Sequence, residues 1–133
     1  RFDCGMTGTH VGCEHGICGA CTILFNNEPV RSCLMLAPQI DNGEITTIEG
    51  ISENSTYDDL REAFKKYHAL QCGYCTPGFL TTIVYLLEKK QYLSDEEIRK
   101  KLSGNICRCT GYTGIVKAVE EVFLNRFKKS KND

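Results

Sequence analysis

Eight of the nine cysteines in the chain fall into two sets of four, and their spacing limits the possible folds more than any other feature. The first set is Cys13-x4-Cys18-x2-Cys21, joined by Cys33 after eleven intervening residues. The second set is Cys72-x2-Cys75, joined after thirty-one residues by Cys107-x-Cys109. Thiolates bind soft metals tightly, and four of them are the ligands that a [2Fe-2S] cluster requires. Two such sets in a short chain predict a protein that transfers electrons rather than one that catalyses a covalent reaction.

The first set has the spacing of plant-type [2Fe-2S] proteins. Gly12, Gly16 and Gly19 lie between or beside its cysteines, where they let the backbone wrap closely and direct N–H groups at a small anionic group. A zinc knuckle is the alternative, and the spacing favours iron and sulfur over it.

The second set is less specific when taken alone. Zinc sites built from two C-x2-C pairs usually separate the pairs by about fifteen to twenty residues. Here the separation is larger and the second pair is C-x-C. The second set therefore favours an iron–sulfur cluster, with a structural zinc site as the alternative.

The length of 133 residues allows one or two small domains. With 41% hydrophobic and 25% charged residues, the composition is that of an ordinary globular protein. The formal net charge of −1 gives no reason to expect binding to nucleic acid or to a membrane surface. The longest apolar run, around Thr81 to Leu87, is too short to span a bilayer.

A secreted disulfide framework is another possible use of nine cysteines. The number is odd, the first residues lack the apolar stretch of a signal peptide, and the spacings include C-x2-C and C-x-C. These features favour reduced, metal-bound thiols and predict a cytoplasmic protein.

The first third of the chain predicts a small, mostly β unit. Thr22 to Phe25 and Val30 to Cys33 are strand-like runs on either side of a turn at Asn26 to Pro29, and Ile45 to Ile48 is a third run. From Thr56 onward the periodicity is helical. Four helices are expected: one starting at Ser55 or Thr56, one from Pro77 with Thr76 as N-cap, one after a capping box at Ser94-x-x-Glu97 and ending at Ser103-Gly104, and one from about Gly114 to Phe127.

The helical half contains a weak internal repeat. Cys75-Thr76 and Cys109-Thr110 each place a Cys-Thr pair before a predicted helix. Two helix–loop–helix units related by a pseudo-two-fold axis would bring these loops together, so the second set would converge despite its long gap. A cysteine at or just before a helix N-terminus gains from the unpaired N–H groups there, which stabilise a thiolate.

Three motifs carry a family resemblance: Gly12 to Thr22 (GCEHGICGACT), Gln71 to Gly78 (QCGYCTPG) and Ser103 to Tyr112 (SGNICRCTGY). In order and spacing they resemble the iron–sulfur subunits of the molybdenum hydroxylases, the family of xanthine dehydrogenase, aldehyde oxidoreductase and carbon monoxide dehydrogenase. The resemblance implies an α+β fold, with an N-terminal β-grasp, plant-type ferredoxin-like domain followed by a four-helix [2Fe-2S] domain. The implied bounds are 1–52 and 53–127, with a flexible basic tail at 128–133. Members of this family have a further hairpin and helix before the segment that starts here at Arg1, so we expect the β-grasp domain to be N-terminally truncated.

The resemblance also implies the sites and the partners. Cys13, Cys18, Cys21 and Cys33 would hold an outer [2Fe-2S] cluster on the flavin side, and Cys72, Cys75, Cys107 and Cys109 an inner one. Gln71 and Cys109 match the family positions that approach the molybdopterin. The implied partners are a large molybdopterin-binding subunit and a medium FAD-binding subunit. The expected function is electron transfer from the molybdenum cofactor through both clusters to FAD or another acceptor, with no catalytic residue on this chain.

A free-standing [2Fe-2S] ferredoxin-like carrier is the alternative function, because it would need only the two clusters. Cys4 has no partner set and is expected to be an ordinary thiol. His10, His15 and His68 are not expected to be ligands, since each site already has four cysteines.

Overall fold

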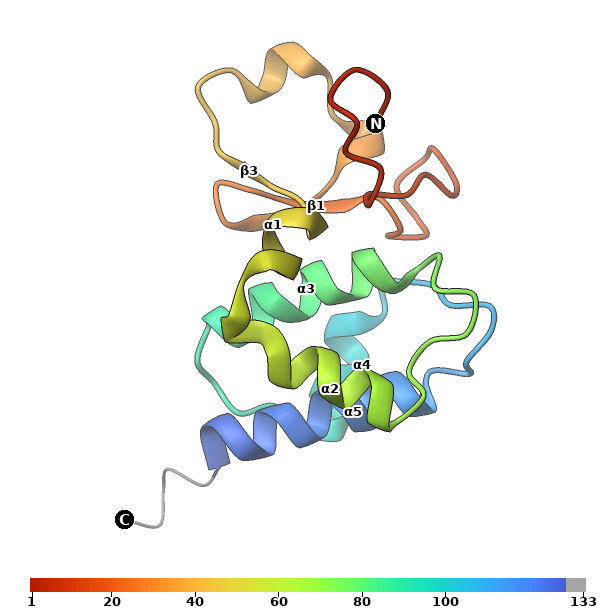
Figure 1. Cartoon of the computed structure of the whole chain (residues 1–133), viewed down its shortest axis with the longest axis vertical. Coiled ribbons are helices and arrows are strands. Elements are labelled where there is room, and N and C mark those ends of the chain that lie inside the picture. The colour runs from red at the N-terminus through yellow and green to blue at the C-terminus, as the bar shows by residue number, and fades with distance from the viewer. Residues whose placement is uncertain (129–133) are drawn as a thin grey trace.

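The structure is a mixed fold in which a small sheet lies over a group of helices (Figure 1). It is a computed structural model, and it describes residues 1–128. The flexible basic tail that was predicted for residues 128–133 lies, apart from Lys128, outside the described residues. The three strands are antiparallel and lie in the order β2-β1-β3.

The predicted hairpin is present, with a tighter turn than expected. Strands β1 (Thr22–Phe25) and β2 (Glu28–Arg31) are joined by Asn26 and Asn27 alone. The φ angles of these two residues are 49° and 64°, as a two-residue hairpin turn requires and as asparagine tolerates. The second strand therefore begins at Glu28, and the prediction that it begins at Val30 was wrong.

The third predicted strand, Ile45 to Ile48, is only half right. Strand β3 (Ile45–Thr46) pairs with β1, but Ile48 begins the helix α1 (Ile48–Glu53), which was not predicted. Gly50 lowers the helix propensity of this segment. The helix forms because Ile48 and Ile51 are buried in the core beside α3, and this tertiary burial outweighs the local preference.

The second half of the chain contains four helices close to the predicted positions. They are α2 (Asp58–Lys66), α3 (Thr76–Glu88), α4 (Asp95–Leu102) and α5 (Thr113–Phe123), and α5 continues into a π-helical turn, Leu124–Lys128. Their apolar faces form one core, in which the most completely buried side chains include Phe79, Ile83, Ile98, Val119 and Phe123.

The helix start signals were predicted with mixed success. The capping box at Ser94 is confirmed, because Ser94 Oγ accepts from Glu97 N and the Glu97 carboxylate accepts from Ser94 N. At α3 the N-cap is Cys75, one residue before the predicted Thr76. Before α2, the side chain of Asn54 accepts from Thr56 N at 3.0 Å, so the capping oxygen comes from a residue that was not predicted.

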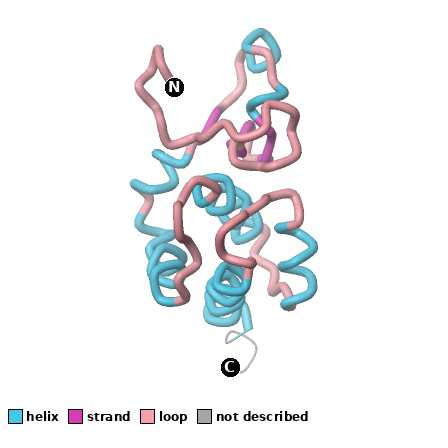
Figure 2. The backbone as a smooth tube through the Cα atoms, turned by 90° about the vertical axis from the view of Figure 1, so that its right-hand side faces the viewer, coloured by secondary structure: helices cyan, strands magenta, loops and turns pink. Residues whose placement is uncertain are grey.

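Helix α3 joins the sheet to the other helices, because it packs against β1 on one side and against α4 on another. Its first turn touches the loop before β1, where a Cβ at Gly78 would lie 2.2 Å from the Gly19 carbonyl oxygen. Beside the N-terminal end of α3, the loops that precede α3 and α5 lie side by side (Figures 1 and 2). Within residues 1–128, no helix has the length and apolar character needed to cross a bilayer.

Candidate metal centres

The second cysteine set converges from two loops that are far apart in sequence. Cys109 Sγ lies 3.5 Å from Cys72 Sγ. Cys75 and Cys107 are also neighbours, and each shifts the pKa of the other, with that of Cys75 raised and that of Cys107 lowered. The internal repeat predicted that these loops would meet, and they do. The four thiols are therefore two pairs, each with one member from either loop.

The environments of these thiols differ. Burial raises the pKa of Cys75 to about 12, and the neighbouring Cys107 adds to this shift. Burial by itself would raise the pKa of Cys107. Hydrogen bonds from the Thr110 hydroxyl and amide outweigh this effect, and the net pKa of Cys107 is lowered. The interaction with Cys72 raises the pKa of Cys109. Of Cys75 and Cys107, the latter is better prepared to act as a thiolate.

The first set lies in the loop before β1 and just after β2. Cys13 Sγ accepts a hydrogen bond from Cys18 N at 3.4 Å. This bond, with further backbone N–H groups near the sulfur, lowers the pKa of Cys13 to about 6. The pKa of Cys33 is raised, first by burial and then by its interaction with the Cys21 thiol. Here too the thiols interact in pairs, Cys13 with Cys18 and Cys21 with Cys33.

A network of hydrogen bonds connects the loops that carry the two cysteine sets. Ile106 N, next to Cys107, donates to the Cys18 carbonyl at 2.8 Å. The buried Asn105 donates from Nδ2 to the Gly19 carbonyl at 3.2 Å. Arg31 donates to Thr22 Oγ1 at 2.6 Å and to the Gly104 carbonyl at 2.5 Å. The loops of the two sets are thus in direct contact.

Sequence reasoning missed Asn105 and Arg31, which form much of this network. The signal for Asn105 was a polar residue inside the motif SGNICRC, where it had no assigned role. No sequence pattern indicated a role for Arg31, because nothing in the sequence places the end of β2 beside Gly104.

The donor sets fit [2Fe-2S] clusters. In such a cluster each of two irons takes two protein ligands, so a site needs two thiolate pairs. Both sets provide this arrangement. The hydroxyl of Thr76, directly after Cys75, is a buried side-chain oxygen without a hydrogen-bond partner in the described chain, which suits a donor whose acceptor is a bound group. Within residues 1–128, no group of three or more Cys, His, Asp or Glu side chains is arranged to hold a single metal ion.

The remaining candidate residues lie around the two sets. Gln71 is exposed beside Cys72, and the ninth cysteine, Cys4, is exposed with a free thiol. His10 stacks on Tyr74 with ring centroids 4.5 Å apart, and Tyr74 Oη donates to the Val11 carbonyl. Tyr74 is half exposed and joins the N-terminal segment to the loop of the second set.

Comparison with known proteins identifies the family. Residues 47–120 match the model of a [2Fe-2S] binding domain. The chain is 51% identical over 125 residues to caffeine dehydrogenase subunit gamma of Pseudomonas sp. (strain CBB1), an alignment that covers 92% of this chain and 75% of that subunit. It is 54% identical over 119 residues to the nicotine 6-hydroxylase small subunit of Paenarthrobacter nicotinovorans, covering 90% and 72% of the two chains.

Solved structures agree. Quinoline 2-oxidoreductase from Pseudomonas putida 86 matches with a TM-score of 0.86 and 42% identity, over 98% of this chain and 80% of that chain. Aldehyde oxidoreductase from Desulfovibrio gigas matches with a TM-score of 0.84 and 36% identity, over 97% of this chain and 14% of that chain. The fold and the sites thus define an iron–sulfur component of an oxidoreductase. The chain belongs to the iron–sulfur small subunits of the molybdenum hydroxylases, as its motifs predicted.

Proposed function

We propose that this chain carries electrons from a molybdenum cofactor on a large partner subunit, through an inner and an outer [2Fe-2S] cluster, to FAD on a medium subunit or to another acceptor. The inner cluster is held by Cys72, Cys75, Cys107 and Cys109, and the outer cluster by Cys13, Cys18, Cys21 and Cys33. When bound, the clusters supply one-electron redox chemistry. The residues of the chain contribute thiolate ligation, hydrogen bonds to sulfur and partial burial.

The observation that carries this proposal is the convergence of the second set. Thirty-one residues separate Cys75 from Cys107, and yet their thiols interact, as do those of Cys72 and Cys109. Helices α3 and α4 and the turns that flank them return the chain to this point. A fold that brings four thiols together as two pairs serves a two-iron cluster.

We extend the proposal to the architecture. The sheet and its cysteine loop form the β-grasp, plant-type ferredoxin-like domain of residues 1–52, and α2 to α5 form the four-helix domain of residues 53–127. Helix α1 spans the proposed boundary, and its buried residues Ile48 and Ile51 join the core of the helical part beside α3. The direct hydrogen bonds between the cysteine loops keep the two sets at a fixed separation.

Exposed apolar side chains near both sets support contacts with partner subunits. Ile17, Leu34 and Leu36 are exposed beside the first set, where we place the FAD-binding subunit. Leu70, Tyr74 and Ile106 are exposed beside the second set, where we place the molybdopterin-binding subunit, with Gln71 and Cys109 approaching the pterin. The free thiols suit a reducing compartment, and we propose the cytoplasm.

The test is a metal and EPR analysis of the native complex with wild-type chain and with Cys109→Ser. We expect about four irons and about four acid-labile sulfides per chain from two clusters. Cys109→Ser should remove or broaden one of the two EPR signals and stop electron flow from the molybdenum subunit. The matched control is Cys4→Ser, which changes an exposed thiol outside both sets and should leave both signals intact.

Three results would contradict the proposal: zinc in place of iron, cystine bridges in place of free thiols, or unchanged turnover in Cys109→Ser. Isolation of the chain as a stable monomer with both clusters and no molybdenum-containing partner would favour the free-standing carrier instead.

A further inference from the structure

The loop after Cys107 returns to hold this cysteine at two points. Thr110 Oγ1 lies 3.1 Å from Cys107 Sγ, and Thr110 N lies 3.4 Å from the same sulfur. At the other end of the residue, Cys107 N donates to Tyr112 Oη at 3.1 Å. Cys107 is therefore fixed through its sulfur by Thr110 and through its amide by Tyr112.

The direction of the Thr110 hydroxyl proton follows from its second partner. Tyr112 N donates to Thr110 Oγ1 at 3.1 Å. Because a backbone N–H can only donate, the hydroxyl oxygen is the acceptor in that bond, and its own proton is free to point elsewhere. The Cys107 sulfur is the acceptor within reach, so the threonine hydroxyl is a donor to it.

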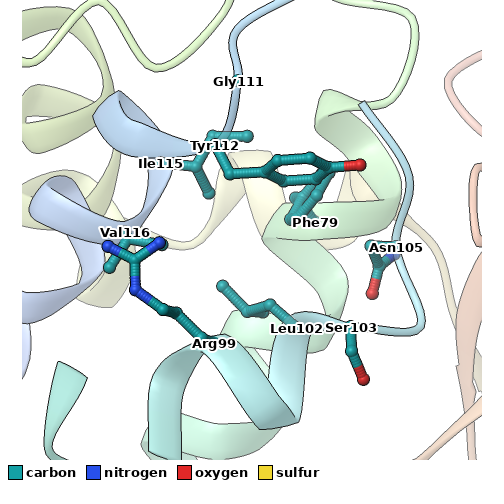
Figure 3. A pocket seen from close by; sticks show the side chains of 9 residues that line it. All are labelled: Phe79, Arg99, Leu102, Ser103, Asn105, Gly111, Tyr112, Ile115 and Val116. Carbon is teal, nitrogen blue, oxygen red and sulfur yellow. The ribbon is translucent and has the colours of Figure 1, made fainter. Parts of the chain in front are cut away.

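The site makes this donor effective. Cys107 is 7% exposed, whereas Cys72 and Cys109 are exposed. A hydrogen bond to a charged sulfur is stronger where water is excluded, because the local dielectric constant is lower. Figure 3 shows the Tyr112 ring from the same loop beside Phe79. Both side chains line a pocket of about 250 Å³. The tyrosine has a φ of 68°, which turns the backbone so that its hydroxyl meets the Cys107 amide.

We propose that Thr110 is a positioning residue that raises the reduction potential of the inner cluster by donating its hydroxyl proton to Cys107 Sγ. This inference rests on the proposed function, in that it requires a cluster on the second set. Reduction adds one electron and one negative charge to the cluster and its sulfur ligands, and no bond breaks. A donor aimed at a ligand sulfur stabilises the more negative state, so its removal lowers the potential.

The experiment is an EPR-monitored dithionite titration of the inner cluster in the assembled complex, with wild type, Thr110→Val and Thr110→Ser. Valine keeps the shape and removes the donor, and serine restores the donor. We expect Thr110→Val to lower the equilibrium constant for reduction about tenfold, or roughly 59 mV for one electron. Thr110→Ser should stay close to wild type. The matched control is Thr113→Val, an identical change at an exposed position three residues further on.

A second measurement detects the hydroxyl proton itself. Hydroxyl protons exchange with D₂O faster than hydrogen-bonded amides. After brief exposure to D₂O, the reduced wild-type cluster should show a coupled deuteron in ENDOR spectra, and Thr110→Ser should keep it. Absence of this deuteron in the wild type, or an unchanged potential in a cluster-loaded Thr110→Val, would overturn the role of Thr110 alone. Absence of iron and sulfide from the wild type would instead overturn the proposed function.

Discussion

Among the residues outside the cysteine sets, Tyr57 shows how burial changes the pKa of a side chain. Tyr57 is buried in the core, and its hydroxyl donates to a Glu88 carboxylate oxygen at 2.7 Å. Burial raises the pKa of Tyr57 to about 12, and the hydrogen bond and negative charge of Glu88 add to the shift, while nearby Arg126 opposes it. The neutral phenol is thus favoured in the folded chain more than in the unfolded one.

This shift predicts a loss of stability at alkaline pH. The folded pKa of Tyr57 lies above the unfolded value near 10, so its contribution is complete below pH 10 and is lost as the pH rises toward 12. We expect the free energy of unfolding of wild type to fall by about 2 kcal/mol more than that of Tyr57→Phe over this range. Urea denaturation of both proteins at intervals from pH 9 to pH 12 measures the difference, and parallel curves would show that the phenol does not contribute.

At the scale of elements, α4 depends most on local signals. Only Ile98 and Leu102 of this helix are buried. Its first turn carries three acidic residues and its last turn three basic ones, which complements the helix dipole, and the Arg99–Asp95 ion pair joins successive turns. Because little apolar area holds α4, its capping box contributes a large share of its stability. Its end also leads directly into the loop of the second set.

Removal of the cap should therefore be measurable. Ser94→Ala removes the side-chain acceptor for Glu97 N, and we expect it to lower the free energy of unfolding by about 1 kcal/mol. Thermal denaturation of the loaded protein gives the value. The matched control is Ser52→Ala in the exposed part of α1, which removes a serine hydroxyl that caps no helix and should cause no loss. Equal losses in both variants would mean that the capping box adds nothing.

At the scale of the whole molecule, the packing of α3 on β1 holds the sheet to the helices, and hydrogen bonds between the cysteine loops add to it. Asn105 is 2% exposed, and it bonds to the Gly19 carbonyl and to Thr82 Oγ1 of α3. It therefore connects the loop of the second set with the loop of the first and with the central helix. A buried amide with both ends bonded fixes the relative position of three segments.

Asn105→Ala tests this connection. The change removes two buried hydrogen bonds and leaves a cavity, so we expect the free energy of unfolding to fall by about 1–3 kcal/mol. Chemical denaturation followed by circular dichroism and by the visible absorption of the clusters should show both signals shifting together. Asn125→Ala, at an exposed position after α5, is the control and should change stability by less than about 0.5 kcal/mol. A shift in one signal alone would mean that the two parts unfold independently.

Local patterns in the sequence determined the β1–β2 hairpin, the four later helices and the capping box at Ser94, because these depend on turn residues, periodicity and caps that act over a few positions. The cysteine spacings also indicated two metal sites, and the Cys-Thr repeat predicted that the loops of the second set would meet. Only the tertiary structure decided that Ile48 begins a helix, since its burial against α3 outweighs a weak local preference. Likewise, the bonds of Arg31 and Asn105 across the cysteine loops and the contact of Thr110 with Cys107 required three-dimensional placement, because each joins groups whose approach depends on how the chain folds back on itself.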